Sequence, residues 1–328
     1  MQGLRQRTMT ANIMRHRLRA ATNTAVSSQT IRRPLHAANI RTRCPNKKSK
    51  LTAGHQDFFL ELLNELKQMN VLTETLQPES NNEFFEVTLN VAEGIEAADG
   101  TAQFKSHVKT FSKRKGYVAS FMSKADEIAH YGTGFHFNHS LWTFDGANVL
   151  FDSSKEDQLS DVARHWIAGL VKHGPGLTAL CMPTVNCYRR IGKERLPTRS
   201  DWSVLDRNAT FVVRKTRKNN IYVEDRLPSS AGNPYLVMAA TVAAGIDGIR
   251  NKIPLQNKTE DFCVLPPDLE TALTCLQEDA VLVGALGKDL VELFVATKTM
   301  EIHHLKSMGQ TSGTDSFQNE YHLYFQNA

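Results

Sequence analysis

The distribution of charge divides this 328-residue chain at Asp57, its first acidic residue. Residues 1–56 contain 12 arginines and lysines, whereas residues 57–328 contain 27 basic and 34 acidic residues. A basic segment with few large apolar residues cannot bury enough surface to fold alone. The rest has the composition and length to form a large core. We therefore expect a disordered basic tail at 1–56 and a mildly acidic folded body at 57–328.

The basic tail has two alternative interpretations. It is rich in arginine, serine and threonine and has no apolar segment, which excludes a secretory signal and is typical of a mitochondrial import signal. A nucleic-acid-binding arm is disfavoured, because residues 1–56 contain no Phe, Tyr or Trp to stack on bases. We expect no nucleic-acid partner.

Cysteine spacing and hydropathy exclude several classes of protein. The five cysteines form no CxxC pair and are odd in number, which disfavours a disulfide framework or a zinc site and indicates a reducing compartment. No apolar run reaches the roughly 18 residues of a membrane helix, so we expect no membrane partner. The predicted location is the cytoplasm, with the mitochondrion as the alternative.

Apolar periodicity predicts a mixture of helices and strands in the body. The expected helices are 58–69 with Asp57 as its N-cap, 94–113, 158–173 ending at Gly174-Pro175-Gly176, 235–249 opened by Asn233-Pro234, 268–278 and 281–300. The expected strands are 84–89, 117–122, 132–142 and a hairpin at 210–226. Because the elements do not alternate strictly as βαβ units, we expect an α+β fold in which helices flank an antiparallel sheet.

Several polar residues lie on strand faces opposite apolar neighbours. Glu86, His136 and Glu224 share this pattern, and Glu79 precedes Glu86 in a loop. Carboxylates with one imidazole suit Mg²⁺ or Mn²⁺. A polar residue on one strand face is more often solvent-facing, so the pattern leaves both explanations open.

Arginines gather between residues 189 and 226, at positions 189, 190, 207, 214 and 226. Their planar guanidinium groups suit phosphate or carboxylate ligands. Ordinary surface charge is the alternative explanation. Together with the carboxylates, the arginines fit a site for a nucleotide and an anionic substrate.

Five segments of the body resemble glutamine synthetases and follow the order of that family. They are GTGFHFNHSLW (132–142), NCYRRI (186–191), WSVLDRNA (202–209), VEDRLPSSAGNPYL (223–236) and AATVAAGIDGI (239–249). The resemblance implies the catalytic-domain fold of that family over 57–328. It reveals no counterpart of the family's N-terminal β-grasp domain, which we expect to be missing.

The resemblance also implies roles for particular residues. The expected metal ligands are Glu79, Glu86, His136 and Glu224. The expected catalytic arginines are Arg190, Arg207 and Arg226, and the expected substrate-binding residues are Asn138, Arg190 and Arg226. In active relatives, ATP and Mg²⁺ or Mn²⁺ convert glutamate to a γ-glutamyl phosphate, and ammonia displaces the phosphate to give glutamine.

The chain also departs from the family's motifs. Asn81-Asn82-Glu83 replaces a PGQ segment, Asn138 replaces a substrate-contacting histidine, and Tyr222 and Ser229 replace an arginine and an aspartate. An upstream E.EF strand, which supplies two further metal carboxylates in active relatives, is not recognised before residue 58.

Within the family, the CMPTVNC segment and the helix after Asn233 are most similar to lengsins, the non-catalytic relatives of vertebrate lens. This similarity implies a homo-oligomer associated with intermediate-filament proteins. We therefore expect weak or no ligase activity and a structural or chaperone-like role. The alternative is an active ligase with glutamate, ammonia and ATP as substrates.

Overall fold

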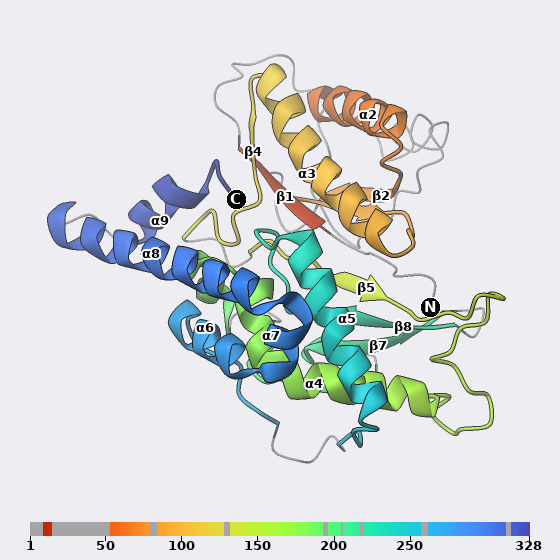
Figure 1. The fold of residues 1–328 in the computed structure, drawn as a ribbon. Helices are drawn as coiled ribbons and strands as arrows, with labels where there is room; N and C mark the ends of the chain where they lie inside the picture. The colour runs from red at the N-terminus through yellow and green to blue at the C-terminus, as the bar shows by residue number, and fades with distance from the viewer. Residues whose placement is uncertain are drawn as a thin grey trace.

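The computed structural model describes residues 9–14, 53–78, 84–127, 132–192, 196–204, 206–216, 220–256, 262–312 and 316–328. Two sheets lie one above the other, each covered by helices (Figure 1). Each sheet has its own apolar core, and the two cores are separate clusters. The expected α+β fold is confirmed.

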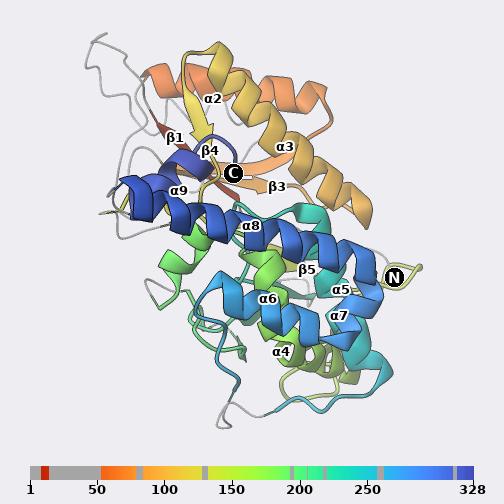
Figure 2. The same cartoon turned by 60° about the vertical axis from the view of Figure 1, so that its left-hand side comes forward.

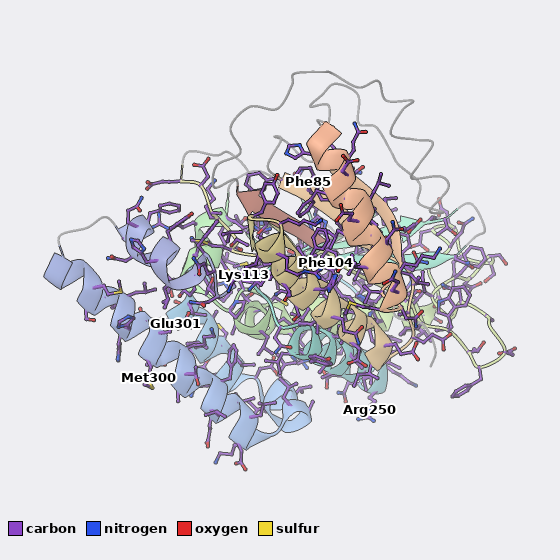
Figure 3. All side chains as sticks on the ribbon, turned by 90° about the horizontal axis from the view of Figure 1, so that it is seen from above. Phe85, Phe104, Lys113, Arg250, Met300 and Glu301 are labelled. Atoms are coloured by element: carbon purple, nitrogen blue, oxygen red, sulfur yellow. The ribbon has the colours of Figure 1, made fainter. Side chains whose placement is uncertain are left out.

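The first sheet has the strand order β2-β3-β1-β4. Its strands are β2 (Thr73–Pro78), β3 (Phe84–Leu89), β1 (Met9–Met14) and β4 (Val118–Ser120). Helices α2 (Ala53–Gln68) and α3 (Ile95–Arg114) cover it. Phe85 and Phe104, both labelled in Figure 3, belong to the aromatic core between these helices and the sheet. The strand expected at 84–89 is confirmed, because its alternating residues pack on this core.

Strand β1 corrects part of the tail prediction. Residues 9–14 were expected in a disordered segment, but they pair antiparallel with β3, where Thr10 lies opposite Glu86, and with β4, where Asn12 lies opposite Ser120. The physical reason is backbone hydrogen bonding. A strand between β3 and β4 satisfies edges that would otherwise be left open. Residues 1–8 and 15–52 lie outside the described residues, and the tail stays a prediction there.

The second sheet has the strand order β5-β8-β7-β6. Its strands are β5 (Phe137–His139), β8 (Ile221–Asp225), β7 (Phe211–Lys215) and β6 (Trp202–Val204). Strands β7 and β8 form the predicted antiparallel hairpin, whereas β6 and β7 are parallel. The strand expected at 132–142 is shorter than predicted, with isolated bridges at Gly134 and Trp142 on either side of β5.

Helices α4 (Asp161–Cys181) and α5 (Pro234–Arg250) cover the second sheet. Their backbones touch, because a methyl group placed on Gly169 would lie 2.2 Å from the carbonyl oxygen of Ala244. Asn233 caps α5 as predicted and accepts hydrogen bonds from the amides of Tyr235 and Leu236. Its side chain thus satisfies amides at the helix start, which have no partner within the helix.

The prediction that a helix ends at Gly174-Pro175-Gly176 is wrong, because α4 continues to Cys181. A proline inside a helix leaves the carbonyl four residues earlier without its usual donor. Here the Ser200 hydroxyl supplies it, donating to the Val171 carbonyl oxygen at 2.6 Å. Gly174 makes room for Ser200, since a methyl group on Gly174 would lie 1.9 Å from the Ser200 Oγ. A tertiary contact thus replaces the missing helical hydrogen bond.

Two other boundary predictions need correction. Helix α2 begins at Ala53, so Asp57 lies within the helix and is not its N-cap; alanine favours helix extension. The helix expected at 281–300 is two helices, α7 (Ala280–Leu286) and α8 (Lys288–Ser312), because Gly287 adopts a φ of 91°. A positive φ interrupts a right-handed helix at little cost only for glycine.

The C-terminal helices cover the second layer and then return to the first (Figure 2). Helix α6 (Leu269–Glu278) packs against α4, and α8 passes α6 and α7 to meet α9 (Ser316–Tyr324). Tyr324 and Phe325 pack on Met122, just after β4. Among the residues described, no helix has both the length and the apolar character needed to cross a membrane.

Candidate functional site

The site is built around Glu224 of β8, on the face of the second sheet opposite its core. Residues 221–225 alternate, so Ile221, Val223 and Asp225 are buried while Tyr222 and Glu224 are half-buried. The Nε of Arg214 and the Nη1 of Arg226 each donate a hydrogen bond of 2.7 Å to the Glu224 carboxylate. Two guanidinium groups therefore hold one carboxylate, an arrangement with excess positive charge.

His136 and Asn138 approach the same carboxylate from the neighbouring strand. Asn138 of β5 is buried and lies directly opposite Glu224 in the β5–β8 pair. His136 precedes β5, and its Nδ1 lies 3.4 Å from a Glu224 oxygen. The structure thus brings together the residues predicted as a metal-binding histidine, a metal-binding carboxylate and a substrate-binding amide.

The electrostatics keep His136 neutral and Glu224 charged. Burial, reinforced by the charges of Arg226, Arg190 and Arg207 and opposed by Glu224, lowers the pKa of His136 to about 3. Burial alone would raise the pKa of Glu224, but His136, Arg214 and Arg226 bring it below its ordinary value. At neutral pH the cluster therefore contains an ionised carboxylate, a neutral imidazole and at least two guanidinium groups.

Arg190 contributes a buried cation beside this cluster. It ends the 3₁₀ helix η1 (Val185–Arg190), and its side-chain stem lies on Gly132, where an added methyl group would come within 2.9 Å of it. Its Nη2 and the His136 ring both flank Gly134. Its Nη1 is buried with no hydrogen-bond partner among the described residues. Burial lowers the pKa of Arg190 to about 10, with Cys187 opposing this shift and Arg226 adding to it.

A buried guanidinium with an unused donor is suited to an anion. Arg190 is charged at neutral pH, and an unsatisfied buried donor is costly. A carboxylate or phosphate oxygen would satisfy it. Arg207 is exposed and lies near enough for its charge to act on His136 and Arg226. The three arginines expected to be catalytic, Arg190, Arg207 and Arg226, are therefore placed around one site. Arg189 instead donates hydrogen bonds to Glu320 of α9.

Of the other two predicted metal ligands, Glu86 is not placed with His136 and Glu224 to form a metal site. Glu79 lies outside the described residues. Glu86 lies on β3 of the first sheet, in register with Thr10 of β1 and Gln77 of β2. In the described part of the chain, no three His, Cys, Asp or Glu side chains are placed to hold one metal ion. Mg²⁺ and Mn²⁺ prefer several oxygen ligands, so the described side chains do not fit the expected cation.

Arg214 was grouped with the other arginines from the sequence, but no catalytic or binding role was predicted for it. It lies on β7 opposite Tyr222, and this register lets its side chain reach Glu224 on the adjacent strand. The strand alternation and the hairpin were both predicted. The pairing register could have identified Arg214 as a neighbour of Glu224, because diagonal residues on one sheet face lie within reach of long side chains.

A second cluster of buried charge lies between α4, α5 and α7, and sequence reasoning missed it entirely. The ring nitrogens of His173 lie 2.6 Å from Asp279 and 3.0 Å from Asp247. Lys172 also donates to Asp247 at 3.0 Å. The remaining oxygen of Asp247 accepts from Asn251, and that of Asp279 accepts from the amides of Val281 and Leu282. We name Lys172, His173, Asp247 and Asp279 the helix cluster.

Comparison with known proteins identifies the family. Residues 16–314 match the family described as glutamine synthetase, catalytic domain. Lengsin of Canis lupus familiaris is 31% identical over 291 residues, which cover 84% of this chain and 49% of that protein. Glutamine synthetase of Thermus thermophilus is 34% identical over 257 residues, which cover 74% of this chain and 57% of that protein. This chain therefore belongs to the glutamine synthetase catalytic-domain family.

Solved structures agree with this assignment. A structure titled a novel glutamine synthase homolog superimposes with a TM-score of 0.78 at 25% identity, covering 98% of this chain and 71% of that one. A structure titled a GmaS/ADP complex superimposes with a TM-score of 0.73 at 25% identity, covering 95% of this chain and 73% of that one. The chain spans about half the length of the curated relatives it matches. The family match begins at residue 16, within the segment predicted as a tail.

Proposed function

We propose that this chain is a glutamine synthetase homologue that retains an anion-binding site but has weak or no ligase activity. Its role is structural or chaperone-like, within a homo-oligomer of the lengsin type. The observation that carries the proposal is the state of Glu224. The carboxylate expected to bind a cation is instead held by Arg214 and Arg226, each at 2.7 Å.

The charge around Glu224 explains why a cation would bind weakly there. A divalent ion near Glu224 would have to compete with two guanidinium groups and would lie close to Arg190. Cation affinity depends on the number and charge of the oxygen ligands. Strand β1, which pairs with the Glu86 strand, contains no Asp or Glu among its six residues. These features support low affinity for the cation that the family's chemistry requires.

Two further observations bear on the structural role. The lengsin of Canis lupus familiaris matches over 84% of the chain, whereas the glutamine synthetase of Thermus thermophilus, at a slightly higher identity of 34%, matches over 74%. This wider coverage is the support for the lengsin-type assignment. By analogy with that subfamily, the partners would be further copies of the chain and intermediate-filament proteins, and the location would be the cytoplasm. The exposed face of α8, where Leu293 is 66% and Met300 is 72% exposed, is available for such contacts. Met300 is labelled on α8 in Figure 3.

The alternative is an active ATP-dependent glutamate–ammonia ligase. It is favoured by the buried, unsatisfied donor of Arg190 and by the arginines that surround His136. These groups would bind the carboxylate of glutamate and offset the negative charge of a transferring phosphate. One superimposed structure is titled a complex with ADP. If this alternative holds, Mg²⁺ or Mn²⁺ and ATP would be the cofactors.

Transfer of the γ-glutamyl group to hydroxylamine, measured with Mn²⁺ and nucleotide, separates the two proposals. We expect no hydroxamate above background. Turnover that disappears in the Glu224→Ala variant would show that the protein is a ligase.

Ligand-induced stabilisation provides an independent test, because a ligand that binds the native state raises its melting temperature. We expect millimolar phosphate or glutamate to raise the melting temperature through the arginines. We expect ATP with Mg²⁺ to add nothing beyond the effect of ATP alone. A further rise that depends on Mg²⁺ would contradict the proposed loss of the cation site.

A further inference from the structure

The turn that follows Arg226 is the structural support of the site. Residues 227–233 connect β8 to α5, and Ser229 and Ser230 within the turn are fully buried. Buried backbone carbonyls require hydrogen-bond donors. The carbonyl oxygens of Ser230 and Gly232 accept hydrogen bonds from a donor in the other layer of the protein, which consists of the first sheet and its helices. The Nζ of Lys105 on α3 donates to them at 2.8 Å and 3.3 Å.

The turn also holds the segment that carries His136. The Phe135 amide donates to the Pro228 carbonyl oxygen at 2.9 Å, and Gly134 forms an isolated bridge with Ser229. The Ser230 hydroxyl is hydrogen-bonded to the Thr133 hydroxyl and donates to the Phe121 carbonyl oxygen at 2.7 Å. The turn and residues 132–136 are therefore one connected unit, and Arg190 lies against its glycines.

Lys105 is placed where its ammonium group contacts both this unit and the Phe121 ring. Its ammonium group lies 5.2 Å from the centre of the Phe121 ring, in the range of a cation–π contact. Burial, assisted by Lys109 and opposed by Cys187, lowers the pKa of Lys105 to about 8. The desolvation of this ammonium is offset by the two carbonyls and the ring. The Tyr235 hydroxyl at the start of α5 also donates to Asp99 of α3 at 2.6 Å. This second contact joins α3 to the helix that follows the turn (Figure 1).

We propose that Lys105 is a positioning residue of the anion-binding site. Its two hydrogen bonds fix the 227–233 turn on α3. The turn then positions Arg226, which directly precedes it, and the Gly132–His136 segment, on which Arg190 lies. Lys105 does not contact the ligand. This inference rests on the proposed anion-binding function, because its effect is expressed as affinity for an anion.

Lys109 provides a matched control. It lies one turn further along α3 and 5.9 Å from the same Phe121 ring, but its Nζ donates to the Gln326 carbonyl oxygen at 3.3 Å. A Lys109→Met variant removes a nearby ammonium group, and we expect it to leave both hydrogen bonds of Lys105 to the turn in place. Lys105→Met removes the two turn contacts, and Lys105→Arg retains a cation that can donate to both carbonyls.

The test measures the affinity of the full chain for inorganic phosphate and for glutamate by calorimetry, together with amide exchange at residues 229–232. We expect Lys105→Met to weaken binding about tenfold, because a turn no longer fixed on α3 leaves the arginines less well ordered for the anion, and to speed exchange in the turn. Lys105→Arg should restore both properties, and Lys109→Met should change neither. If Lys105→Met does not fold, Lys105→Gln, which keeps one donor, replaces it.

Two results would overturn the inference. The first is that Lys105→Met binds the anion and exchanges its turn amides as the wild type does. The second is that Lys109→Met loses as much anion affinity as Lys105→Met. If the wild type binds neither phosphate nor glutamate, the proposed anion-binding function is wrong. Amide exchange then decides the role of Lys105 by itself: unchanged exchange in Lys105→Met rejects it, and faster exchange confined to that variant supports it.

Discussion

The protein contains two clusters of buried charge that differ in how fully their polar groups are satisfied. In the helix cluster, His173 lies between two carboxylates, and every oxygen of Asp247 and Asp279 accepts a hydrogen bond. In the site around Glu224, guanidinium groups outnumber carboxylates, and the Nη1 of Arg190 has no partner in the part of the chain that the structure describes.

This difference separates a structural role from a binding role. A buried network in which every donor and acceptor is paired stabilises one arrangement of the helices and has no donor or acceptor left for a ligand. A network with excess positive charge and an unused donor is less stable by itself and gains most when an anion binds. Mutations in the helix cluster should therefore change stability, whereas mutations in the site should change binding.

The largest expected effect is at Asp279. Replacing Asp279 with alanine removes the partner of the buried His173 and the N-cap of α7. Breaking a buried ion pair costs about 3–5 kcal/mol of unfolding free energy. Urea unfolding measures this loss. The control is Asp268→Ala, which removes the N-cap of α6 and should cost about 1 kcal/mol. Equal losses in the two variants would contradict a role for the ion pair.

The helix cluster should also make stability depend on pH. Burial alone would lower the pKa of His173, but Asp279 and Asp247 raise it above 6.5, whereas His173 helps bring the pKa of each carboxylate below 3.8. The contribution of the histidine is therefore complete below pH 6.5 and is lost as pH rises through its folded pKa. The contribution of the carboxylates is present above pH 3.8 and is lost in acid.

Unfolding free energies of the wild type and His173→Gln, measured from pH 5 to pH 9, test this dependence. The difference between the two proteins should shrink as pH rises. Lys172 also faces Asp247 and is present in both proteins. A difference that stays constant or grows with pH would mean that His173 is neutral in the folded protein.

A smaller loss of stability is expected at Glu224. The Glu224→Gln variant removes the charge held by Arg214 and Arg226, yet both arginines can take up an anion from solution. We expect a loss on the order of 1–2 kcal/mol in chloride buffer and a smaller loss in phosphate buffer. Equal losses in the two buffers would show that no anion replaces the carboxylate.

The smallest effect on stability is expected at Arg190, where binding should change instead. Arg190→Gln removes the buried cation with the unused donor. We expect about tenfold weaker binding of phosphate or glutamate, measured by calorimetry, and a change in unfolding free energy below about 1 kcal/mol. Unchanged affinity would place the anion elsewhere in the protein.

Local patterns predicted much of the fold. The hairpin of β7 and β8, the strand at 84–89 and the start of α5 all depend on alternation or on a capping residue, which are properties of neighbours in sequence. The end of α4 could not be predicted in this way. The donor that allows the helix to pass Pro175 is Ser200, 29 residues from the carbonyl that it serves.

The residues of the candidate site also differ in whether local sequence patterns could identify them. Glu224, His136 and the arginines at 190, 207 and 226 were identified from their motifs and strand faces. Arg214 was grouped with these arginines, but its contact with Glu224 was not predicted, because that contact depends on the register between two strands. Lys105 and the helix cluster were not identified from the sequence, because their contacts join residues that are 74 to 127 positions apart.

The sequence by itself determined the family, the order of most elements and the residue types available for chemistry. Only the tertiary structure decided which charges meet. It held Glu224 between two arginines, left the Nη1 of Arg190 without a partner among the described residues, and enclosed His173 between two aspartates. The physical reason is that helix and strand periodicity depend on adjacent residues, whereas the state of a buried charge depends on groups that folding brings together from distant parts of the chain.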